Sequence, residues 1–319
     1  MIKPRLNKML NIKYPIILDT IPFVSDVKLV QAVSEAGGLG VLTPSIEDPK
    51  NFYFDIMGLK ETGFPFGVKI PLDMEGHEDF FNTALEEKVE IVITSDGSPG
   101  RFIERLKESN CKLIHQINNL DEIKEVVSLG VDALIVKGYD GAGILRNARL
   151  NSMTLTSLVA DQVKIPVFTA GAFADGRALP AAISLGADAV VINSRLLVTE
   201  ESIVHENYKN AIINSYAEDT VIVLKNHNSI RLLRNKFTDE LLEMEASGVS
   251  CEELKELLSP DKFIQGMIEG DTENGALIAD QAVGLIKGIK AVSTVLREMN
   301  YEAMIITDQL NQYKPKLNC

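Results

Sequence analysis

The sequence predicts an α/β fold, a (β/α)8 TIM barrel followed by a small helical cap. Short apolar runs alternate with segments of helical periodicity eight times before residue 216. These runs are continuously apolar, as expected for strands that are buried on both faces of a parallel sheet. After residue 216 the pattern changes to charged helical segments. Eight successive strand–helix units of this size are what a closed barrel needs.

The expected elements follow one another along the chain with glycine, proline or asparagine between them. The eight expected strands are residues 14–18, 38–42, 66–70, 90–95, 111–116, 132–137, 165–170 and 188–193. The expected helices are residues 26–36, a segment from 48, and residues 77–87, 99–109, 119–129, 152–163, 175–185 and 203–215. An open doubly wound sheet is the alternative. It would usually carry GxGxxG after its first strand, and "YPIILDTIPF" contains no glycine.

Three regions follow from this pattern. We expect a barrel over residues 1–216, a helical cap or substrate domain over 217–274, and C-terminal helices over 275–319 that pack back on the barrel. The cap prediction depends on the charged helical periodicity that begins after the eighth unit. Small apolar residues return in "GALIADQAVGLIKGI", which is typical of close helix packing.

Composition excludes several classes of protein. The formal charge of −13 and the pI near 4.9 argue against a nucleic-acid partner, whose phosphates need a basic surface. The sequence contains no run of 18 apolar residues, so we expect no membrane span. No apolar stretch follows the basic N-terminus, so we expect no signal peptide. The three cysteines and four histidines lack metal-binding spacing, so we expect no metal site. A cytoplasmic protein is the expectation.

The loops after the seventh and eighth expected strands indicate a phosphate site. Catalytic residues of barrel enzymes lie in the loops that follow the strands. Gly171 and Ala172 follow the seventh strand, and Asn193 and Ser194 follow the eighth. Their backbone amides and the Ser194 hydroxyl are placed to hold a phosphate monoester, because these two loops form the common phosphate site of the fold. An ordinary tight turn in each loop is the alternative.

Several blocks of the sequence resemble the nitronate monooxygenase (2-nitropropane dioxygenase) and FMN-dependent enoyl-ACP reductase family. They include "AVSEAGGLGVL", "PFGVKI" and "SMTLTSLVADQVKIPVFTAGAFADGRALPAAISLGADAVVINSRLLVTEES". The resemblance runs from about residue 7 to 290 and is densest from 152 to 209. It implies an FMN-binding barrel with a small cap, so the phosphate ligand would be FMN. In the reductase branch it also implies NAD(P)H as a co-substrate.

The chain departs from the family after the first strand and at the end of the third. The family usually has QGGM or a similar run where residues 18–22 read "LDTIP". The resemblance nevertheless places Thr20, Ile21 and Pro22 beside the flavin. Lys69 stands where the family often has asparagine, near the flavin pyrimidine. A cation there would stabilise the negative charge that reduction creates at N1–C2=O; a solvent-facing lysine is the alternative.

A third departure lies in "KGYDGAGI", residues 137–144, which aligns with the family's E-G-x-E-A-G-G-H. The histidine that takes the α-proton in nitronate monooxygenases falls on Ile144, which cannot transfer a proton. The acidic residue at the strand end becomes Lys137. Tyr139 is the only nearby group with a proton to give, but its ordinary pKa of about 10 makes it a poor base. A loop aromatic packed on the cap is the alternative.

The candidate site residues therefore fall into two groups. The candidate catalytic residues are Lys69 and Tyr139. The candidate cofactor-binding residues are Thr20, Ile21, Pro22, Lys69, Ser95, Lys137, Gly141, Ala142, Gly143, Gly171, Ala172, Asn193, Ser194 and Gln281.

We expect an FMN-dependent oxidoreductase that uses NAD(P)H to reduce an activated double bond or a similar acceptor. Loss of the base harms nitronate oxidation more than this reaction, because nicotinamide supplies its own hydride. A nitronate monooxygenase acting on preformed nitronate is one alternative, and a flavin-binding protein with little turnover is another. A different phosphate ligand in place of FMN is a further one. We expect a small-molecule or acyl substrate and no nucleic-acid or membrane partner, and a homodimer is compatible with the sequence.

Overall fold

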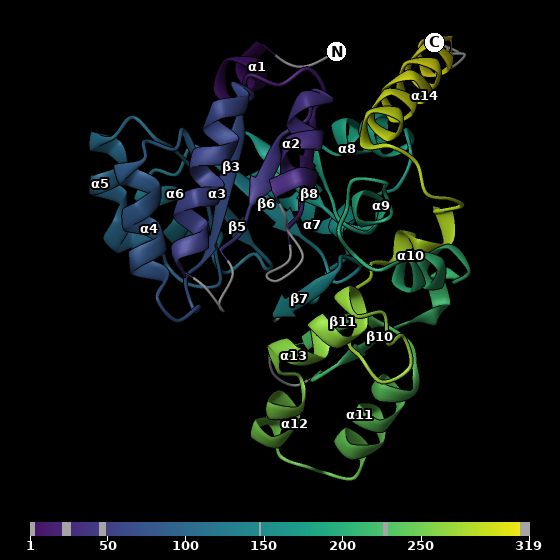
Figure 1. Cartoon of the computed structure of the whole chain (residues 1–319). Helices are drawn as coiled ribbons and strands as arrows, with labels where there is room; N and C mark the ends of the chain where they lie inside the picture. The colour runs from purple at the N-terminus through teal and green to yellow at the C-terminus, as the bar shows by residue number, and fades with distance from the viewer. Residues whose placement is uncertain (1–3, 21–26, 45–48, 147, 226–228, 313–319) are drawn as a thin grey trace.

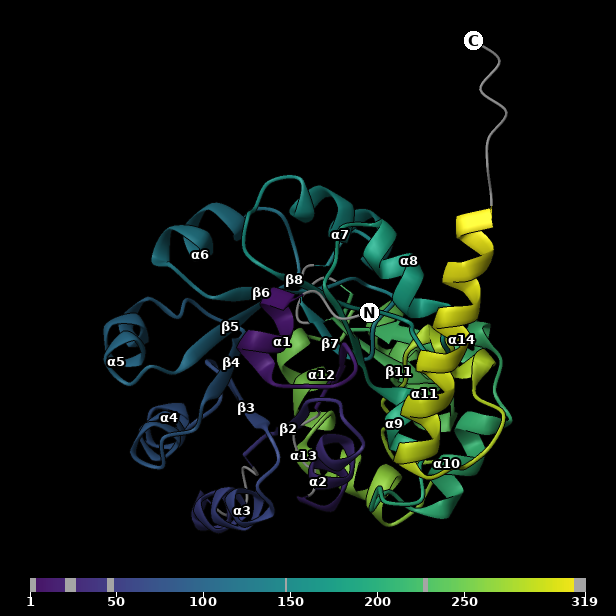
Figure 2. The same cartoon turned by 90° about the horizontal axis from the view of Figure 1, so that it is seen from above.

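Eight parallel strands form the predicted barrel, and helices surround it (Figures 1 and 2). The computed structural model describes residues 4–20, 27–44, 49–146, 148–225 and 229–312. The barrel strands are β1 (Ile16–Leu18), β2 (Gly40–Leu42), β3 (Phe66–Pro71), β4 (Ile91–Ser95), β5 (Lys112–Ile117), β6 (Ala133–Lys137), β8 (Val167–Ala170) and β9 (Ala189–Ile192). Each strand overlaps the run predicted for it.

The sheet closes on itself. Its order is β1-β9-β8-β6-β5-β4-β3-β2, which leaves β1 and β2 as the two ends of the ladder. The amide of Leu18 donates to the carbonyl of Leu39 at 3.0 Å, and the amide of Leu39 donates to that of Ile16 at 2.9 Å. These bonds join the two ends, so the (β/α)8 fold class is confirmed and the open sheet is excluded.

Helices follow the strands around the outside of the barrel, as Figure 2 shows. They are α2 (Val27–Glu35), α3 (Pro49–Thr62), α4 (His77–Glu86), α5 (Ile103–Glu108), α6 (Ile123–Leu129), α7 (Ser152–Ala160), α8 (Ala178–Ser184), α9 (Ser194–Leu197) and α10 (Glu206–Ile213). Asn151 caps α7, its side chain accepting a hydrogen bond from the amide of Thr154.

The barrel interior is apolar at one end and polar at the other. Side chains on a strand alternate between its two faces, so every second residue points inward. Inward residues form one apolar cluster, which Leu6 and Leu10 of α1 (Pro4–Leu10) close at the N-terminal end. Along six strands the next inward position after this cluster is polar: Asp19, Thr43, Ser95, Gln116, Lys137 and Asn193. Lys69 takes the equivalent position on β3, two residues after Gly67. Strand register thus gathers seven polar side chains at the C-terminal mouth.

The cap combines the predicted helices with a small sheet. The helices are α11 (Lys236–Ala246), α12 (Cys251–Leu257) and α13 (Pro260–Phe263). The antiparallel sheet, in the order β10-β11-β7, contains β10 (Thr220–Val223), β11 (Ser229–Leu233) and β7 (Gly143–Arg146). Sequence periodicity did not predict these strands. Because β7 comes from the loop after β6, that loop is hydrogen-bonded to the cap (Figure 1).

The C-terminal helix α14 (Val292–Gln312) packs back on the barrel beside α8, as Figure 1 shows. It buries an apolar face that consists of Val292, Val295, Leu296, Met299 and Ala303. The carboxylate of Glu302 accepts a hydrogen bond from the amide of Gly176 at 2.7 Å. Within the described part of the chain, no helix has the length and apolar character needed to cross a membrane.

Candidate active site at the barrel mouth

A cavity of about 360 Å³ lies between the C-terminal ends of the strands and the cap. This volume is within the usual range for small-molecule sites. The barrel contributes polar side chains to its floor, including Thr20, Thr43, Lys69, Ser95, Gln116 and Lys137. The opposite wall is largely apolar and contains Ile144, Ile230, Leu258, Pro260, Phe263 and Ile278. The cavity can therefore hold a ligand with one polar and one apolar side.

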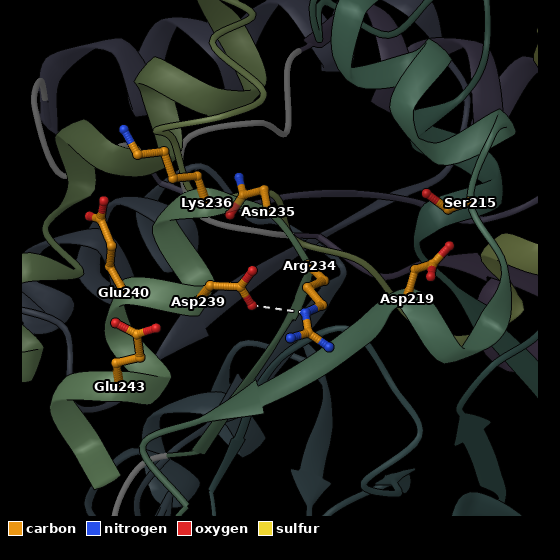
Figure 3. A pocket seen from close by; sticks show the side chains of 8 residues that line it. All are labelled: Ser215, Asp219, Arg234, Asn235, Lys236, Asp239, Glu240 and Glu243. Atoms are coloured by element: carbon orange, nitrogen blue, oxygen red, sulfur yellow. Dashed lines mark hydrogen bonds and ion pairs between the residues drawn. The ribbon is translucent and has the colours of Figure 1, made fainter. Parts of the chain in front are cut away.

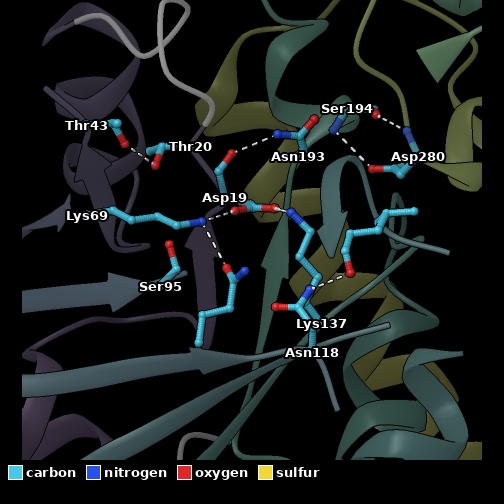
Figure 4. A network of polar contacts seen from close by, with 12 residues as sticks. Asp19, Thr20, Thr43, Lys69, Ser95, Asn118, Lys137, Asn193, Ser194 and Asp280 are labelled. Atoms are coloured by element: carbon cyan, nitrogen blue, oxygen red, sulfur yellow. Dashed lines mark hydrogen bonds and ion pairs between the residues drawn. The ribbon is translucent and has the colours of Figure 1, made fainter. Parts of the chain in front are cut away.

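Two buried lysines share one carboxylate at the floor of the cavity (Figure 4). Lys69 Nζ lies 3.1 Å from Asp19 Oδ1, and Lys137 Nζ lies 3.1 Å from Asp19 Oδ2. Lys69 also donates to Gln116 Oε1 at 2.9 Å. The lysine predicted to face the flavin thus points into the barrel mouth, and the solvent-facing alternative is excluded. The lysine-floor network comprises Asp19, Lys69, Gln116 and Lys137.

Burial and pairing oppose each other in the lysine-floor network. Burial alone would raise the pKa of Asp19, but the ammonium groups of Lys137 and Lys69 outweigh it and lower that pKa, so Asp19 stays ionised. Burial lowers the pKa of Lys137, with Lys69 acting in the same direction and Asp19 opposing. Lys137 therefore releases a proton more readily than an ordinary lysine. The floor can stabilise negative charge and can also supply a proton.

Acidic side chains at the cavity rim hold the end of β7 against the barrel. Arg146 Nε donates to Asp96 Oδ1 at 2.7 Å, and the guanidinium also pairs with Asp73. Ser95 Oγ donates to Asp96 Oδ2 at 2.6 Å. Burial would raise the pKa of Asp96, but Arg146 and the hydrogen bond from Ser95 outweigh it and lower that pKa. The predicted contact residue Ser95 thus lines the cavity with its hydroxyl already bonded to Asp96.

The loop after β6 places an aliphatic side chain where the family resemblance expected a base. Ile144 lines the cavity and pairs with Ile230 across the β7–β11 ladder. None of the described residues that line the cavity is a histidine. His115 on β5 is buried and bonded to Thr94 Oγ1, and burial lowers the pKa of its imidazole to about 4. This ring is a neutral interior group.

Tyr139, the second candidate catalytic residue, is anchored through its backbone. Its carbonyl accepts hydrogen bonds from Arg231 Nε at 3.0 Å and Nη2 at 2.8 Å. Arg231 is buried and also donates to Thr220 Oγ1 at 2.9 Å. Tyr139 is not among the described residues that line the cavity. The geometry thus gives its hydroxyl no contact with the cavity, and its role stays an unsupported prediction.

Replacing Arg231 with methionine is expected to lower the free energy of unfolding by about 2–3 kcal/mol. The change removes charge-assisted hydrogen bonds and leaves the Tyr139 carbonyl without its donor. Urea denaturation measures the loss. Arg234→Met is the matched control, because Arg234 is exposed and pairs with Asp239 at 2.8 Å, and such exposed pairs contribute roughly 0–1 kcal/mol. Equal losses in the two variants would contradict this assignment.

The loops predicted to hold phosphate do not line the cavity, and acidic side chains already contact two of their amides. Ser194 N donates to Asp280 Oδ2 at 3.2 Å, and Asp280 N donates to Ser194 Oγ at 2.9 Å. Ala172 N donates to Asp140 Oδ2 at 3.4 Å. The cavity and its cationic floor fit the ring of a flavin. In this arrangement, however, the loops after β8 and β9 do not fit a phosphate, because the Asp280 carboxylate already accepts the hydrogen bond of the Ser194 amide.

The remaining candidate residues lie around these two parts. Ala142 and Gly143 line the cavity, whereas Gly141 is buried beside Lys137. The Gln281 amide donates to the Asp140 carbonyl at 3.2 Å, away from the cavity lining. Asn193 Nδ2 donates to the Asp19 carbonyl at 2.9 Å. Gly171 packs on Ser152, and Ile21 and Pro22 lie outside the described residues.

Three functional contacts were missed in the sequence. Asp19, Thr43 and Gln116 join the floor, although none of them is among the candidate site residues. Strand register would have found them, because each stands two residues after an inward apolar residue. Asp280 follows no strand of the barrel, so no periodicity indicates its place beside Ser194.

A second depression lies on the cap, away from the barrel mouth (Figure 3). It is lined by Ser215, Asp219, Arg234, Asn235, Lys236, Asp239, Glu240 and Glu243. The ion pair between Arg234 and Asp239 crosses it at 2.8 Å. Charged surface side chains of this kind are solvated, and the barrel strands contribute none of its residues. The mouth cavity is therefore the candidate reaction site.

Comparison with known proteins identifies the family. The sequence model of the nitronate monooxygenase family matches residues 3–84 and 80–302. FabK from Thermotoga maritima is 32% identical, with a TM-score of 0.92 over 98% of this chain and all of that one. A probable nitronate monooxygenase of Staphylococcus aureus (strain N315) is 28% identical over 76% of this chain and 81% of its own.

A third relative carries a different name. The (3aS,4S,5R,7aS)-5-hydroxy-7a-methyl-1-oxo-octahydro-1H-indene-4-carboxyl-CoA dehydrogenase of Mycobacterium tuberculosis is 26% identical over 94% of this chain and 95% of its own length. These names cover more than one reaction, but the family match spans most of the chain. The chain therefore belongs to the nitronate monooxygenase family, a family of flavin-dependent oxidoreductases.

Proposed function

We propose that this protein is an FMN-dependent reductase that uses NAD(P)H to reduce an activated double bond or a similar acceptor in a small-molecule or acyl substrate. The proposal depends on one observation: two lysines lie at the floor of the cavity, and no histidine among the described lining residues can act as a base. Lys69 and Lys137 face the cavity, and Ile144 stands where deprotonation would need a histidine. Such a site favours reactions in which negative charge develops on the substrate over reactions that begin by removing a proton.

The polar floor and the apolar wall opposite it, which we call the roof, have different roles. Flavins supply hydride-transfer chemistry when they are bound. Lys69 and Lys137 stabilise negative charge that develops above them, and the lowered pKa of Lys137 makes its ammonium a proton donor to that charge. The apolar roof, with Leu258 and Phe263, excludes water and suits the hydrocarbon part of an acyl substrate.

Nitronate oxidation is the second candidate. The cationic floor would bind a preformed nitronate anion, which needs no base. A neutral nitroalkane, however, must lose its α-proton, and Ile144 cannot accept it. A binding protein with little turnover would keep the cavity but transfer no hydride. These three functions predict different responses to nicotinamide and to nitronate.

Anaerobic mixing with reduced nicotinamide nucleotides tests the proposal. Protein saturated with FMN is mixed with NADH and, separately, with NADPH, and the visible absorbance of oxidised flavin is followed. A reductase loses this absorbance with at least one of the two. If neither nicotinamide reduces the flavin while an alkyl nitronate consumes oxygen, the monooxygenase assignment replaces ours. No response to either reagent leaves a binding protein.

A further inference from the structure

We propose that the carboxylate of Asp280 takes the place of the cofactor's phosphate at the loop after β9, and that FMN binds there only when this carboxylate is displaced or neutralised. The inference rests on the proposed function and concerns the affinity for the cofactor rather than the reaction. Asp280 would then set how tightly this chain binds FMN.

The carboxylate of Asp280 accepts a hydrogen bond from an amide that is expected to bind the phosphate. Its Oδ2 accepts from the Ser194 amide at 3.2 Å, and its Oδ1 accepts from the Ala282 amide at 2.9 Å. Its own amide donates to Ser194 Oγ at 2.9 Å, so the Ser194 amide is engaged by the carboxylate and the hydroxyl oxygen accepts from the same residue (Figure 4). An anion bound to backbone amides at this position satisfies them without any ligand.

The surroundings of Asp280 make a second anion unfavourable. Its side chain is fully buried, and among the described residues no lysine or arginine forms an ion pair with it. The charged and titratable groups that act on it or feel its charge are Asp19, Tyr208 and Arg231. Of these, Arg231 is bonded to Tyr139 and Thr220 instead. A phosphate placed beside ionised Asp280 would therefore meet a negative charge that no ion pair neutralises.

A neighbouring side chain lacks a partner that a cofactor would provide. Asn193 is 2% exposed, and its Oδ1 has no hydrogen-bond donor within the described part of the chain. Buried acceptors of this kind are normally satisfied. The hydroxyl groups of a ribityl chain are donors of the required type. This unsatisfied oxygen, next to Ser194, independently indicates that a polar ligand reaches the space beside Asp280.

Protonation offers a route to neutralisation. Burial raises the pKa of Asp280 to about 6, although hydrogen bonds from Ser194 and Ala282 oppose the rise. Below that pH the carboxyl is neutral and does not repel a phosphate. Above it, FMN binding must take up a proton or move the side chain. The affinity for FMN should therefore fall with rising pH above about 6, by up to roughly tenfold per pH unit for one proton.

The experiment compares FMN with riboflavin, which has the same ring and ribityl chain but no phosphate. Both are titrated into the full chain by quenching of flavin fluorescence, for wild type, Asp280→Asn and Asp280→Ala, between pH 5.5 and about 8.5. Asp188→Asn is the matched control, since Asp188 is a buried carboxylate bonded to the Val167 amide at the other end of the barrel. Thermal melts confirm that each variant is folded.

We expect roughly 10- to 100-fold tighter FMN binding in both Asp280 variants at pH 8, with riboflavin unchanged in all proteins and Asp188→Asn like wild type. The FMN phosphate ionises in the same way with both proteins, so its contribution cancels in the ratio of the wild-type affinity to the Asp280→Ala affinity. This ratio should still change with pH. Equal FMN affinities in wild type and both variants would overturn the inference and leave the proposed function intact. If no protein binds either flavin, the proposed function and the inference both fail.

Discussion

Replacing Asp19 with alanine is expected to lower the free energy of unfolding by about 3–5 kcal/mol. Asp19 is the shared counter-ion of Lys69 and Lys137, each 3.1 Å away, and all three side chains are buried. Its removal leaves two like charges in a site with little water, which is the situation in which breaking a buried ion pair is most destabilising. Urea denaturation at neutral pH measures the change.

Two controls separate charge from packing in this experiment. Lys69→Met should lose less stability, because Lys137 still neutralises Asp19. A triple variant, with Asp19→Ala, Lys69→Met and Lys137→Met, should recover most of the loss, since apolar replacement of a buried ionic group is often neutral. A loss below about 1 kcal/mol in Asp19→Ala would show that the two lysines do not depend on this carboxylate.

The same Lys69→Met substitution is expected to lower the rate of NAD(P)H-driven reduction by roughly 10²- to 10³-fold, the usual effect of removing one preorganised electrostatic group. The side chain is buried at the cavity floor, so its charge acts in a weakly screened environment. Anaerobic stopped-flow reduction of FMN-saturated protein measures the rate, and the reduction potential of the bound flavin should fall in parallel.

Lys112→Met is the control for this substitution. Lys112 lies at the far end of β5, is exposed, and pairs with Asp132 at 3.0 Å. Its replacement should leave the rate and the potential unchanged. If Lys69→Met reduces the flavin as fast as wild type, with an unchanged potential, then Lys69 holds the floor together without acting on the reaction.

Sequence periodicity predicted the barrel because its signals are local. Each strand is a continuous apolar run followed by a turn residue and a helical segment, so eight units can be identified without any long-range contact. The cap sheet is different. Its strand β7 is only Gly143–Arg146, and it pairs with residues more than eighty positions later in the chain. Short strands that depend on a distant partner leave little local signal.

The candidate site was predictable where it depends on strand ends. Lys69 and Lys137, identified through the family resemblance, and Ser95 all lie at predicted strand ends, and they line the cavity. The contacts of the two lysines with Asp19 were not predictable, because Asp19 is 50 residues from Lys69 and 118 from Lys137 in the sequence. The link between Asp280 and Ser194 spans 86 residues. Only the closed barrel brings these groups together.

Reductase activity is tested most directly by anaerobic consumption of NAD(P)H with a 2-enoyl thioester as the acceptor, catalysed by protein saturated with FMN. We expect NAD(P)H to be oxidised and the saturated thioester to form in equal amount, because the cationic floor stabilises negative charge on the acceptor. Absence of both changes, with rapid consumption of an alkyl nitronate and oxygen by the same preparation, would contradict this expectation.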